Sequence, residues 1–506
     1  MRTMIGNLLA IDLGTSSVKV LVTSSSGEIR GRGESSYPIL TPASGIAEQD
    51  PEHWWQSTID AVSQALRYID AASNPIACIG LSGQMHGTVL IDEDGFPLVN
   101  AVIWPDQRSA RQVREIAELV GLERIVLITG SPAATGFQAA TIRWFQQHKP
   151  EVWNRVRKIL LPKDYLKWRL TGEYSTDPSD ASGTLLFDIC RRSWSARLLG
   201  ILEVNINQLP QVIASDAIGG MLSKEAAEAL GLSMDIPVVS GAGDVACGLL
   251  GAGVTNGNTL LLTISTGGQI ALPVAGPLVD AKGRIHTFCS ASEPTSDEMG
   301  YFQLGAILAA GLSLKWISEQ ILSDSEHIPY SRLTEWAAKS PPGSNGLIYL
   351  PYFAGERTPH MNPEAKGALL GLTIQHGRED MVRAVMEGAA MACFDAYTVL
   401  DELDASPGTI VMAGGGARSR LWRQIIADVF NLPVQTPLVR EQAAYGAAIL
   451  AGSGVGYHSI PQAARQWPAH DAPVEPNPQN HEQYKSLVDI YRSAYHATQI
   501  EPFGTS

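Results

Sequence analysis

The chain has 506 residues, of which 45% are hydrophobic and 17% are charged. This length favours two large domains over one, and the mixture supplies apolar material for two buried cores, which argues against general disorder. The formal net charge of −14, from 37 Lys and Arg against 51 Asp and Glu, disfavours nucleic-acid or anionic-membrane partners, because both reward a basic face.

The five cysteines, Cys78, Cys190, Cys247, Cys289 and Cys393, are scattered and never form a close metal-ligand pair. Such usage is typical of buried, reduced thiols in a cytosolic protein. The apolar run near the start is too short for a signal peptide, and no later run is long enough to span a bilayer. We therefore expect a cytoplasmic protein.

The first informative segment, LLAIDLGTSSVKVLVTSSSGEI from Leu8, has two apolar runs around a turn of small residues. In a P-loop or dinucleotide-binding fold the glycine turn would lead into a helix. Here Val18, Val20 and Val22 alternate with other residues, as they do in a strand. The segment predicts a β-hairpin with a tip suited to phosphate.

A second copy of this pattern occurs in NTLLLTISTGGQIALPV, which begins at Asn258. Aligned on the turn, Thr15 matches Thr266, and Asp12 matches Thr263, so the copy loses the acid. Self-similarity at this spacing predicts two related domains with a ligand-binding cleft between them.

The glycine-rich stretch 251–257 gives the expected boundary, with an N-terminal domain over 1–253 and a C-terminal domain over 254–506. The N-terminal domain, which carries the first hairpin, is expected to bind the substrate and to contact phosphate through that hairpin, and the C-terminal domain is expected to bind a nucleotide. Helices are predicted over 108–120, over 377–403 and after 483, and strand, glycine turn and helix over 409–430.

Two acids are candidates for chemistry. Asp12, beside a hydroxyl-rich turn, suits Mg²⁺, which prefers one or two carboxylates together with water and phosphate oxygens. Asp244 follows Gly-Ala-Gly, which allows a close ligand, and could accept the proton of an attacking alcohol. The alternatives are an ordinary turn in which Asp12 caps amides, and a turn-forming role for Asp244.

Two further sets of residues have weaker signals. Gly414, Gly415 and Gly416 precede a helix near Arg420, where a nucleotide could approach, although tight turns also use such runs. Ser419 is either a helix cap or an adenosine contact. The segments SGQMHG and IWPDQR carry polar groups suited to hydroxyl recognition, which are Gln84, His86, Asp106 and Arg108. His86 has no nearby partner for metal binding.

Taken together, these motifs resemble those of the FGGY carbohydrate kinases, and the resemblance runs from end to end. It is carried by GALLGLTIQHGREDMVRAVMEG and by PYFAGERTPHMNPEAKG. SGQMHG, LPKDYLKWRLTGE and PYFAGERTP look most like the segments of xylulokinases. The resemblance implies an α/β fold of two duplicated actin-like ATPase domains (ribonuclease H-like, hexokinase-type) with an interdomain cleft. It also implies ATP-dependent phosphorylation of a ketose, D-xylulose, at its 5-hydroxyl.

The resemblance also implies roles for single residues. Asp244 would be the general base, and Asp12, with Asp244, would hold Mg²⁺. The ATP phosphates and adenosine would be held by Gly14, Thr15, Ser16, Lys19, Ser265, Thr266, Gly267, Gly268, Gly311, Lys315, Gly414, Gly415, Gly416 and Ser419. The sugar would be bound by Gln84, Met85, His86, Trp104, Asp106, Arg108 and Asp244. Relatives are commonly dimers, so a homodimer is possible, and domain closure would exclude water.

Several positions depart from the family pattern. Thr141 replaces a lysine, Gln138 replaces a small hydroxyl residue, and Ser265 replaces a glycine. Pro105 and Gln107, where xylulokinases commonly have Asn and Gly, put the identity of the sugar in doubt. The alternatives are a kinase for another ketose, a pentitol or a sugar acid, a non-catalytic sugar- or nucleotide-binding regulator, and, with least support, a cytoskeletal actin relative.

Overall fold

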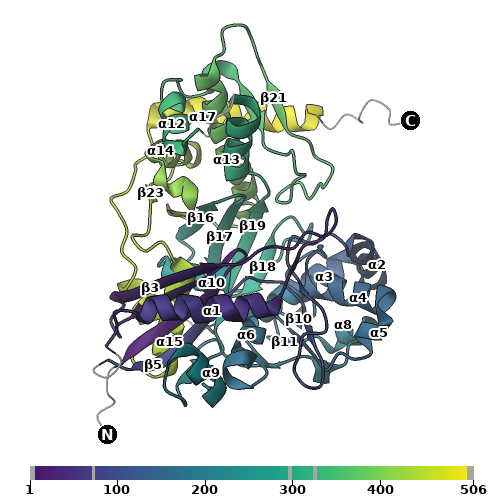
Figure 1. Cartoon of the computed structure of the whole chain (residues 1–506). Coiled ribbons are helices and arrows are strands. Elements are labelled where there is room, and N and C mark those ends of the chain that lie inside the picture. The colour runs from purple at the N-terminus through teal and green to yellow at the C-terminus, as the bar shows by residue number, and fades with distance from the viewer. Residues whose placement is uncertain (1–5, 71–73, 295–298, 323–327, 499–506) are drawn as a thin grey trace. The chain divides into compact units, whose positions relative to one another are not determined.

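The structure is a computed structural model that describes residues 6–70, 74–294, 299–322 and 328–498. It consists of two compact units (Figure 1), each of which is described by itself. Unit 1 comprises residues 1–256, 273–302 and 441–469, and unit 2 comprises residues 257–272, 303–440 and 470–506.

Both units are assembled from three separate segments of the chain, whereas the predicted domains, 1–253 and 254–506, are continuous. The difference concerns residues 273–302 and 441–469, which pack with the first half of the chain. The assignment of sugar binding to one domain and nucleotide binding to the other stays a prediction.

Unit 1 is built on a sheet with the strand order β13-β14-β5-β1-β2-β3, and β15 also pairs with β5. The bounds of these strands are β1 Asn7–Leu13, β2 Ser17–Thr23, β3 Ile29–Ser36, β5 Ile76–Gly83, β13 Ile218–Met221, β14 Pro237–Val239 and β15 Ala242–Gly243. The antiparallel pair β1–β2, with Asp12 opposite Lys19, confirms the first predicted hairpin. β1, β14 and β15 run parallel to β5, so their carboxyl ends meet at one edge of the sheet.

Two helices pack closely on this sheet. α1 (Pro51–Leu66) contacts β2 and β3, and α15 (Gln442–Gly454) contacts β5, β1 and α10 (Asp244–Gly251). A Cβ atom at Gly33 would lie 1.9 Å from the carbonyl oxygen of Ala61, and one at Gly80 would lie 1.9 Å from that of Ala447. Glycine is therefore required where each helix crosses the sheet.

Shorter elements fill the rest of unit 1, and α2 confirms the helix predicted over 108–120. These elements are β4 Glu48–Gln49, β6 Val89–Ile91, β7 Ala101–Val102, α2 Ala110–Val120, α3 Leu122–Thr129, α4 Gln138–His148, α5 Pro150–Trp153, β8 Lys158–Leu160, α6 Pro162–Thr171, β9 Ser175–Thr176, α7 Pro178–Ala181, β10 Phe187–Asp188, β11 Ser193–Trp194, α8 Ala196–Ile201, β12 Gln211–Val212, α9 Lys224–Leu230, β18 His286–Cys289 and α16 Ile460–Gln466.

Unit 2 has consecutive strands in the order β19-β17-β16-β22-β23. Their bounds are β16 Thr259–Ile264, β17 Gly268–Val274, β19 Tyr301–Ile307, β22 Thr409–Ala413 and β23 Val434–Gln435. β16 and β17 form the second predicted hairpin, and β16 is parallel to β22. The arrangement β17-β16-β22 repeats β2-β1-β5, and Thr263, like Asp12, is the last residue but one of its strand. The predicted duplication is therefore present in the strand pairing.

The helices of unit 2 confirm two further predictions, since α13 and α14 lie where the sequence pattern places them. A last helix, α17, is also present, but it begins at Pro478 and not after 483 as predicted. The elements are α11 Gly311–Trp316, α12 Tyr330–Ala337, β20 Ile348–Leu350, β21 Ala368–Leu370, α13 Arg378–Asp401, α14 Arg420–Phe430 and α17 Pro478–Thr498. Val385, Ala389 and Ala392, which are spaced as on one helix face, are all buried. In the described part of the chain, no helix is long and apolar enough to cross a bilayer.

The cysteines are not all buried, although the sequence predicts that they are. Cys78, Cys247, Cys289 and Cys393 are buried, but Cys190 is exposed, so the prediction is wrong for that thiol.

Candidate active site

Two acids lie at the edge of the unit 1 sheet where parallel strands end. Asp12 of β1 is the register partner of Ser82 of β5, and Ser82 Oγ donates a hydrogen bond of 2.8 Å to Asp12 Oδ1. Ser82 is also the partner of Ala242 in β15, which places Asp244 two residues beyond that pair. Asp244 is the first residue of α10, and its Oδ1 accepts a hydrogen bond of 2.8 Å from the backbone N–H of Val245.

Asp12 is buried, and Asp244 is half-buried. Burial raises the pKa of Asp12, against the opposing effects of the Ser82 hydrogen bond and the charge of Lys19. Burial, followed by the charge of Asp12, raises the pKa of Asp244 to about 7. A carboxylate with a pKa near neutrality suits a general base, because it is available ionised and still holds a proton well.

The tip of the first hairpin, Gly14 to Ser16, is anchored on both sides. The Tyr37 hydroxyl donates to the carbonyl oxygen of Gly14, and Gln49 Nε2 donates to that of Thr15 at 2.7 Å. Trp104 Nε1 donates to Thr15 Oγ1 at 3.0 Å, so this hydroxyl already has a partner. Ser16 is exposed and accessible to a ligand. Lys19 is half-buried and electrostatically coupled to Asp12, which argues against a purely solvent-directed side chain.

The SGQMHG segment continues from the end of β5 into the same region. A Cβ atom added to Gly243 would lie 2.9 Å from Met85 Cγ, so Met85 packs directly beside the residue before Asp244. His86 has a positive φ of 73° and stacks on Phe137 with ring centroids 4.0 Å apart. Its Nδ1 lies 2.7 Å from the carbonyl oxygen of Gly183. Gln84 is buried, and its Nε2 donates to Gln49 Oε1 at 2.9 Å.

Asp106 and Arg108 form a closed ion cluster. Asp106 is 1% exposed, and its two oxygens accept four hydrogen bonds, from Ala47 N and from the backbone N, Nε and Nη2 of Arg108. Arg108 Nη2 also reaches Glu48 Oε1 at 2.7 Å. A sugar hydroxyl at Asp106 would therefore have to displace an existing donor, whereas Trp104, 36% exposed, is accessible.

Unit 2 contains a cavity of about 580 Å³ at the tip of its hairpin. Seven residues predicted to bind the nucleotide line it, namely Ser265, Thr266, Gly311, Lys315, Gly415, Gly416 and Ser419. The predicted Gly267, Gly268 and Gly414 are not among its lining residues. The hairpin tip packs tightly, since Leu312 N donates to the carbonyl oxygen of Thr266 at 2.8 Å. Ser419 Oγ accepts a hydrogen bond of 3.2 Å from the backbone N–H of Trp422 and so caps α14, which was one of its two predicted roles. Ser419 also lines the cavity.

Sequence reasoning missed several residues of both sites. The cavity is also lined by Ile264, Leu312, Leu314, Tyr330, Ser331, Thr334, Arg418 and Trp422. In unit 1, sequence reasoning missed Ser82, although it is the first residue of the SGQMHG segment. Ser179 was also missed, and its Oγ accepts a hydrogen bond of 3.0 Å from the backbone N–H of Gly243. No local signal connects Ser179 to Asp244, because the two lie on different elements.

Comparison with known proteins gives consistent results over the whole chain. The profile of the FGGY family of carbohydrate kinases, N-terminal domain, matches residues 7–251, and that of the C-terminal domain of the same family matches residues 272–455. A xylulose kinase of Bacillus subtilis (strain 168) is 35% identical over 495 residues, which cover 97% of this chain and 97% of that protein. A gluconokinase of the same strain is 32% identical over 451 residues, which cover 88% of this chain and 86% of that protein.

A solved structure agrees with these sequence matches. The crystal structure of ligand-bound xylulose kinase from Lactobacillus acidophilus has a TM-score of 0.91 at 26% identity, and covers 98% of this chain and 99% of that one. These likenesses confirm the predicted α/β fold of duplicated actin-like ATPase domains and the predicted enzyme class, an ATP-dependent sugar kinase. The chain belongs to the FGGY family of carbohydrate kinases.

Proposed function

We propose that this kinase transfers the terminal phosphoryl group of ATP to the 5-hydroxyl of D-xylulose, with Asp244 as the general base. The observation that carries the proposal is the meeting of Asp244, Asp12 and Met85 at one edge of the unit 1 sheet. The extensive match to a xylulose kinase of Bacillus subtilis supports the choice of sugar.

Asp244 would accept the proton of the attacking hydroxyl as the oxygen forms its bond to phosphorus. Its pKa of about 7 allows both states of this cycle near neutral pH. His86, fixed by Phe137 and Gly183, and Trp104, fixed by Thr15, would orient the sugar so that the reacting hydroxyl faces Asp244. Such positioning is the main contribution that a protein makes to phosphoryl transfer.

The donor set around Asp12 and Asp244 fits Mg²⁺. Burial has the larger effect on the pKa of Asp244, and the negative charge of Asp12 raises this pKa further. A divalent cation held by these carboxylates would relieve their repulsion. Among the described residues, no group of three or more His, Cys, Asp and Glu side chains is arranged to hold a metal. Water and phosphate oxygens would supply the remaining ligands, as Mg²⁺ prefers. Bound there, the ion would neutralise charge on the phosphates.

The unit 2 cavity would hold the nucleotide. Its hydroxyl-bearing tip, Ser265 and Thr266, and Lys315 of α11 suit phosphate, and its apolar members Leu314 and Trp422 suit a purine ring. Ser265, where the family has a glycine, is one of the residues that line this cavity. Its hydroxyl would donate to a phosphate oxygen.

A sugar acid is the second candidate acceptor, because a gluconokinase also matches this chain. Its carboxylate would need a cation, and the guanidinium of Arg108 is already paired with Asp106 and Glu48. Gln107, one of the departures from the family pattern, donates to the carbonyl oxygen of Pro105 in its own loop and accepts from Thr135 Oγ1 in the connection between α3 and α4. Both observations favour an uncharged sugar.

The test is ADP release with Mg-ATP against D-xylulose, D- and L-ribulose, L-xylulose, gluconate, glycerol and pentitols. We expect D-xylulose to exceed every other acceptor in kcat/KM by at least about tenfold, and Asp244→Asn to abolish most of this turnover. A larger kcat/KM for gluconate would replace the sugar with a sugar acid. Failure on all acceptors would contradict the proposal. A cytoplasmic location and a homodimer stay predictions, which fractionation and light scattering would test.

A further inference from the structure

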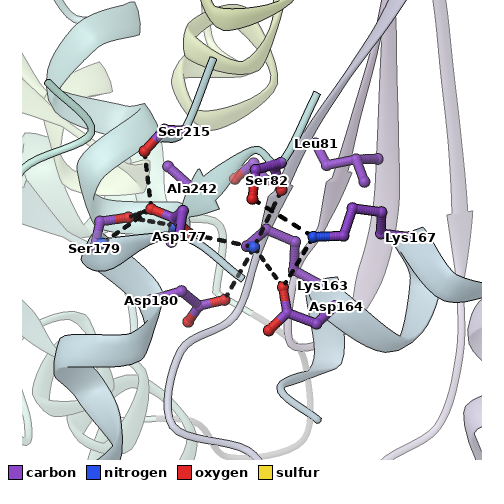
Figure 2. A network of polar contacts seen from close by, with 12 residues as sticks. Leu81, Ser82, Lys163, Asp164, Lys167, Asp177, Ser179, Asp180, Ser215 and Ala242 are labelled. Atoms are coloured by element: carbon purple, nitrogen blue, oxygen red, sulfur yellow. Dashed lines mark hydrogen bonds and ion pairs between the residues drawn. The ribbon is translucent and has the colours of Figure 1, made fainter. Parts of the chain in front are cut away.

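Unit 1 buries a cluster of charged side chains next to the strand that leads to Asp244. Lys163 of α6, Asp177 and Asp180 are each 0% exposed. Figure 2 shows that the side chains of both aspartates point toward Lys163. Lys163 Nζ lies 2.7 Å from Asp164 Oδ1, 3.2 Å from Asp177 Oδ1 and 3.7 Å from Asp180 Oδ2. Burying so many ionisable groups costs free energy that an apolar core would avoid, so the cluster calls for an explanation beyond stability.

Lys163, at the centre of this cluster, keeps its positive charge. Burial lowers the pKa of Lys163, but the carboxylates of Asp164, Asp177 and Asp180 outweigh it and leave the pKa above its ordinary value. Burial also raises the pKa of Asp180 well above its ordinary value. Lys163 stays a cation, and its ammonium group lies 3.2 Å from Asp177 Oδ1, where it can hold that side chain in place.

A chain of hydrogen bonds runs from this ion pair to the residue before Asp244. Asp177 Oδ2 accepts from the backbone N–H of Ser179 at 2.9 Å and from Ser179 Oγ at 2.5 Å. Because the Ser179 hydroxyl donates its hydrogen bond to Asp177, its oxygen can accept a second hydrogen bond. The backbone N–H of Gly243 donates that bond, at 3.0 Å.

The same cluster holds the other end of that short segment. Lys163 Nζ donates to the carbonyl oxygen of Ser240 at 3.2 Å. The next residue, Gly241, has a φ of 76°, a conformation that favours glycine, so the backbone turns sharply there. Between these two bonds lies β15, which has only two residues and therefore little strand pairing of its own. The direction in which Asp244 leaves the strand thus depends on these contacts.

We propose that Lys163, Asp177 and Ser179 are positioning residues that hold the Gly243–Asp244 peptide, and with it the Asp244 carboxylate, in the geometry for proton transfer. This inference rests on the proposed role of Asp244 as the base. It assigns a purpose to the buried ion cluster, since small displacements of a catalytic group lower turnover strongly.

The chain offers a matched control for Ser179. Ser182 is also 0% exposed, its Oγ donates to the carbonyl oxygen of Ser179 at 2.7 Å, and it accepts from the backbone N–H of Cys289 at 3.2 Å. Ser179→Ala and Ser182→Ala therefore each remove one donated and one accepted hydrogen bond from the same buried region. Of these two hydroxyls, Ser179 contacts the peptide before Asp244.

The experiment compares kcat, the KM values for D-xylulose and ATP, and the unfolding temperature of both variants with wild type. We expect Ser179→Ala to lower kcat at least tenfold while both KM values change less than threefold, and Ser182→Ala to keep kcat within twofold. Both should unfold at lower temperature. Asp177→Asn, which removes the charge that faces Lys163, should also lower kcat and serves if Ser179→Ala does not fold. Equal kcat in the Ser179→Ala and Ser182→Ala variants would overturn the proposal.

A second measurement separates this inference from the proposed function. If wild type shows no turnover on any acceptor, the proposed function fails, and crystal structures of the two variants decide the positioning role. A shift of the Asp244 carboxylate in Ser179→Ala that is absent from Ser182→Ala would support it. An unmoved Asp244 in both variants would overturn it.

Discussion

Ser82 Oγ donates a hydrogen bond of 2.8 Å to Asp12 Oδ1, and the two residues are register partners in neighbouring parallel strands. The bond fixes the orientation of a carboxylate that burial makes harder to ionise. Hydrogen bonds to a carboxylate that binds a metal act on the metal affinity as well as on the fold.

Ser82→Ala should therefore raise the Mg²⁺ concentration needed for half-maximal activity by roughly tenfold, the usual scale for losing such a bond. The measurement is phosphoryl transfer as a function of free Mg²⁺ at fixed ATP. Ser17→Ala is the control, because Ser17 Oγ also donates to a carboxylate, Glu34 Oε1 at 3.0 Å, in the same sheet. An identical Mg²⁺ dependence in both variants would contradict the role given to Asp12.

Asp244→Asn should lower kcat at least about 100-fold, the usual scale for losing a general base. The fold should survive, because the oxygen of Asn can still accept the Val245 N–H. The folded pKa of Asp244, about 7, lies above its ordinary value of 3.8, so the stability that the neutral acid contributes is lost as pH rises through 7. Asn cannot ionise, and the variant should unfold at higher temperature than wild type at pH 8.

The two readouts for Asp244→Asn are turnover and thermal unfolding at pH 5 and pH 8. Loss of activity together with gained stability at pH 8 would identify a residue whose position serves function at the expense of the fold. Turnover near that of wild type would remove Asp244 from the mechanism.

The buried side chain of Glu356 should make the folding stability of the protein depend on pH, independently of catalysis. It is 2% exposed, and its Oε1 accepts from Arg357 N at 2.7 Å and from Leu308 N at 3.0 Å. Burial raises its pKa to about 8, from an ordinary 4.5, so the folded state holds a proton that the unfolded state has lost between these values. Wild-type stability should fall as pH rises through this window, because folding then requires uptake of a proton. Each unit of difference between the two pKa values corresponds to about 1.4 kcal/mol.

Glu356→Gln keeps an acceptor oxygen but cannot ionise. The variant and wild type should have similar unfolding temperatures at pH 5, and the variant should be higher by at least about 2–4 °C at pH 8.5. Glu335→Gln is the control, because the side chain of Glu335 is 60% exposed and should leave the pH profile unchanged. A constant difference between the Glu356→Gln variant and wild type across this range would refute the buried neutral acid.

The two hairpins could be predicted because strand alternation and small-residue turns are local signals. Val18, Val20 and Val22 are all buried in β2, as the alternation requires. The pairing of β15 with β5 could not be predicted, since a two-residue strand has no pattern and its partner, Ser82, lies far along the chain. The placement of α15 on the unit 1 sheet likewise depends on Gly80 accommodating Ala447, which periodicity does not reveal.

The buried ion cluster shows the same limit for the site. Charged residues such as Lys163 and Lys167 in a helix ordinarily indicate a solvent-exposed face, yet both are 0% exposed. The burial of Lys163 depends on Asp177 and Asp180, which a local pattern does not link to it. Local sequence patterns made Asp12 and Asp244 candidates, and the family resemblance implied their roles, but the contacts that orient them come from tertiary structure.

The shape of the nucleotide cavity should depend on the close backbone packing at Gly311. A Cβ atom at this position would lie 2.0 Å from the carbonyl oxygen of Ser265, which is backbone and cannot swing away. Gly311→Ala should therefore push the hairpin tip out of place and weaken ADP binding at least about tenfold, as measured by calorimetry, because displaced phosphate donors no longer converge. Gly200→Ala is the control, since an added Cβ there meets nothing within 4 Å. Unchanged ADP affinity in a folded Gly311→Ala variant would mean that the nucleotide does not use the tip formed by Ser265 and Thr266, and would move its phosphates elsewhere in unit 2.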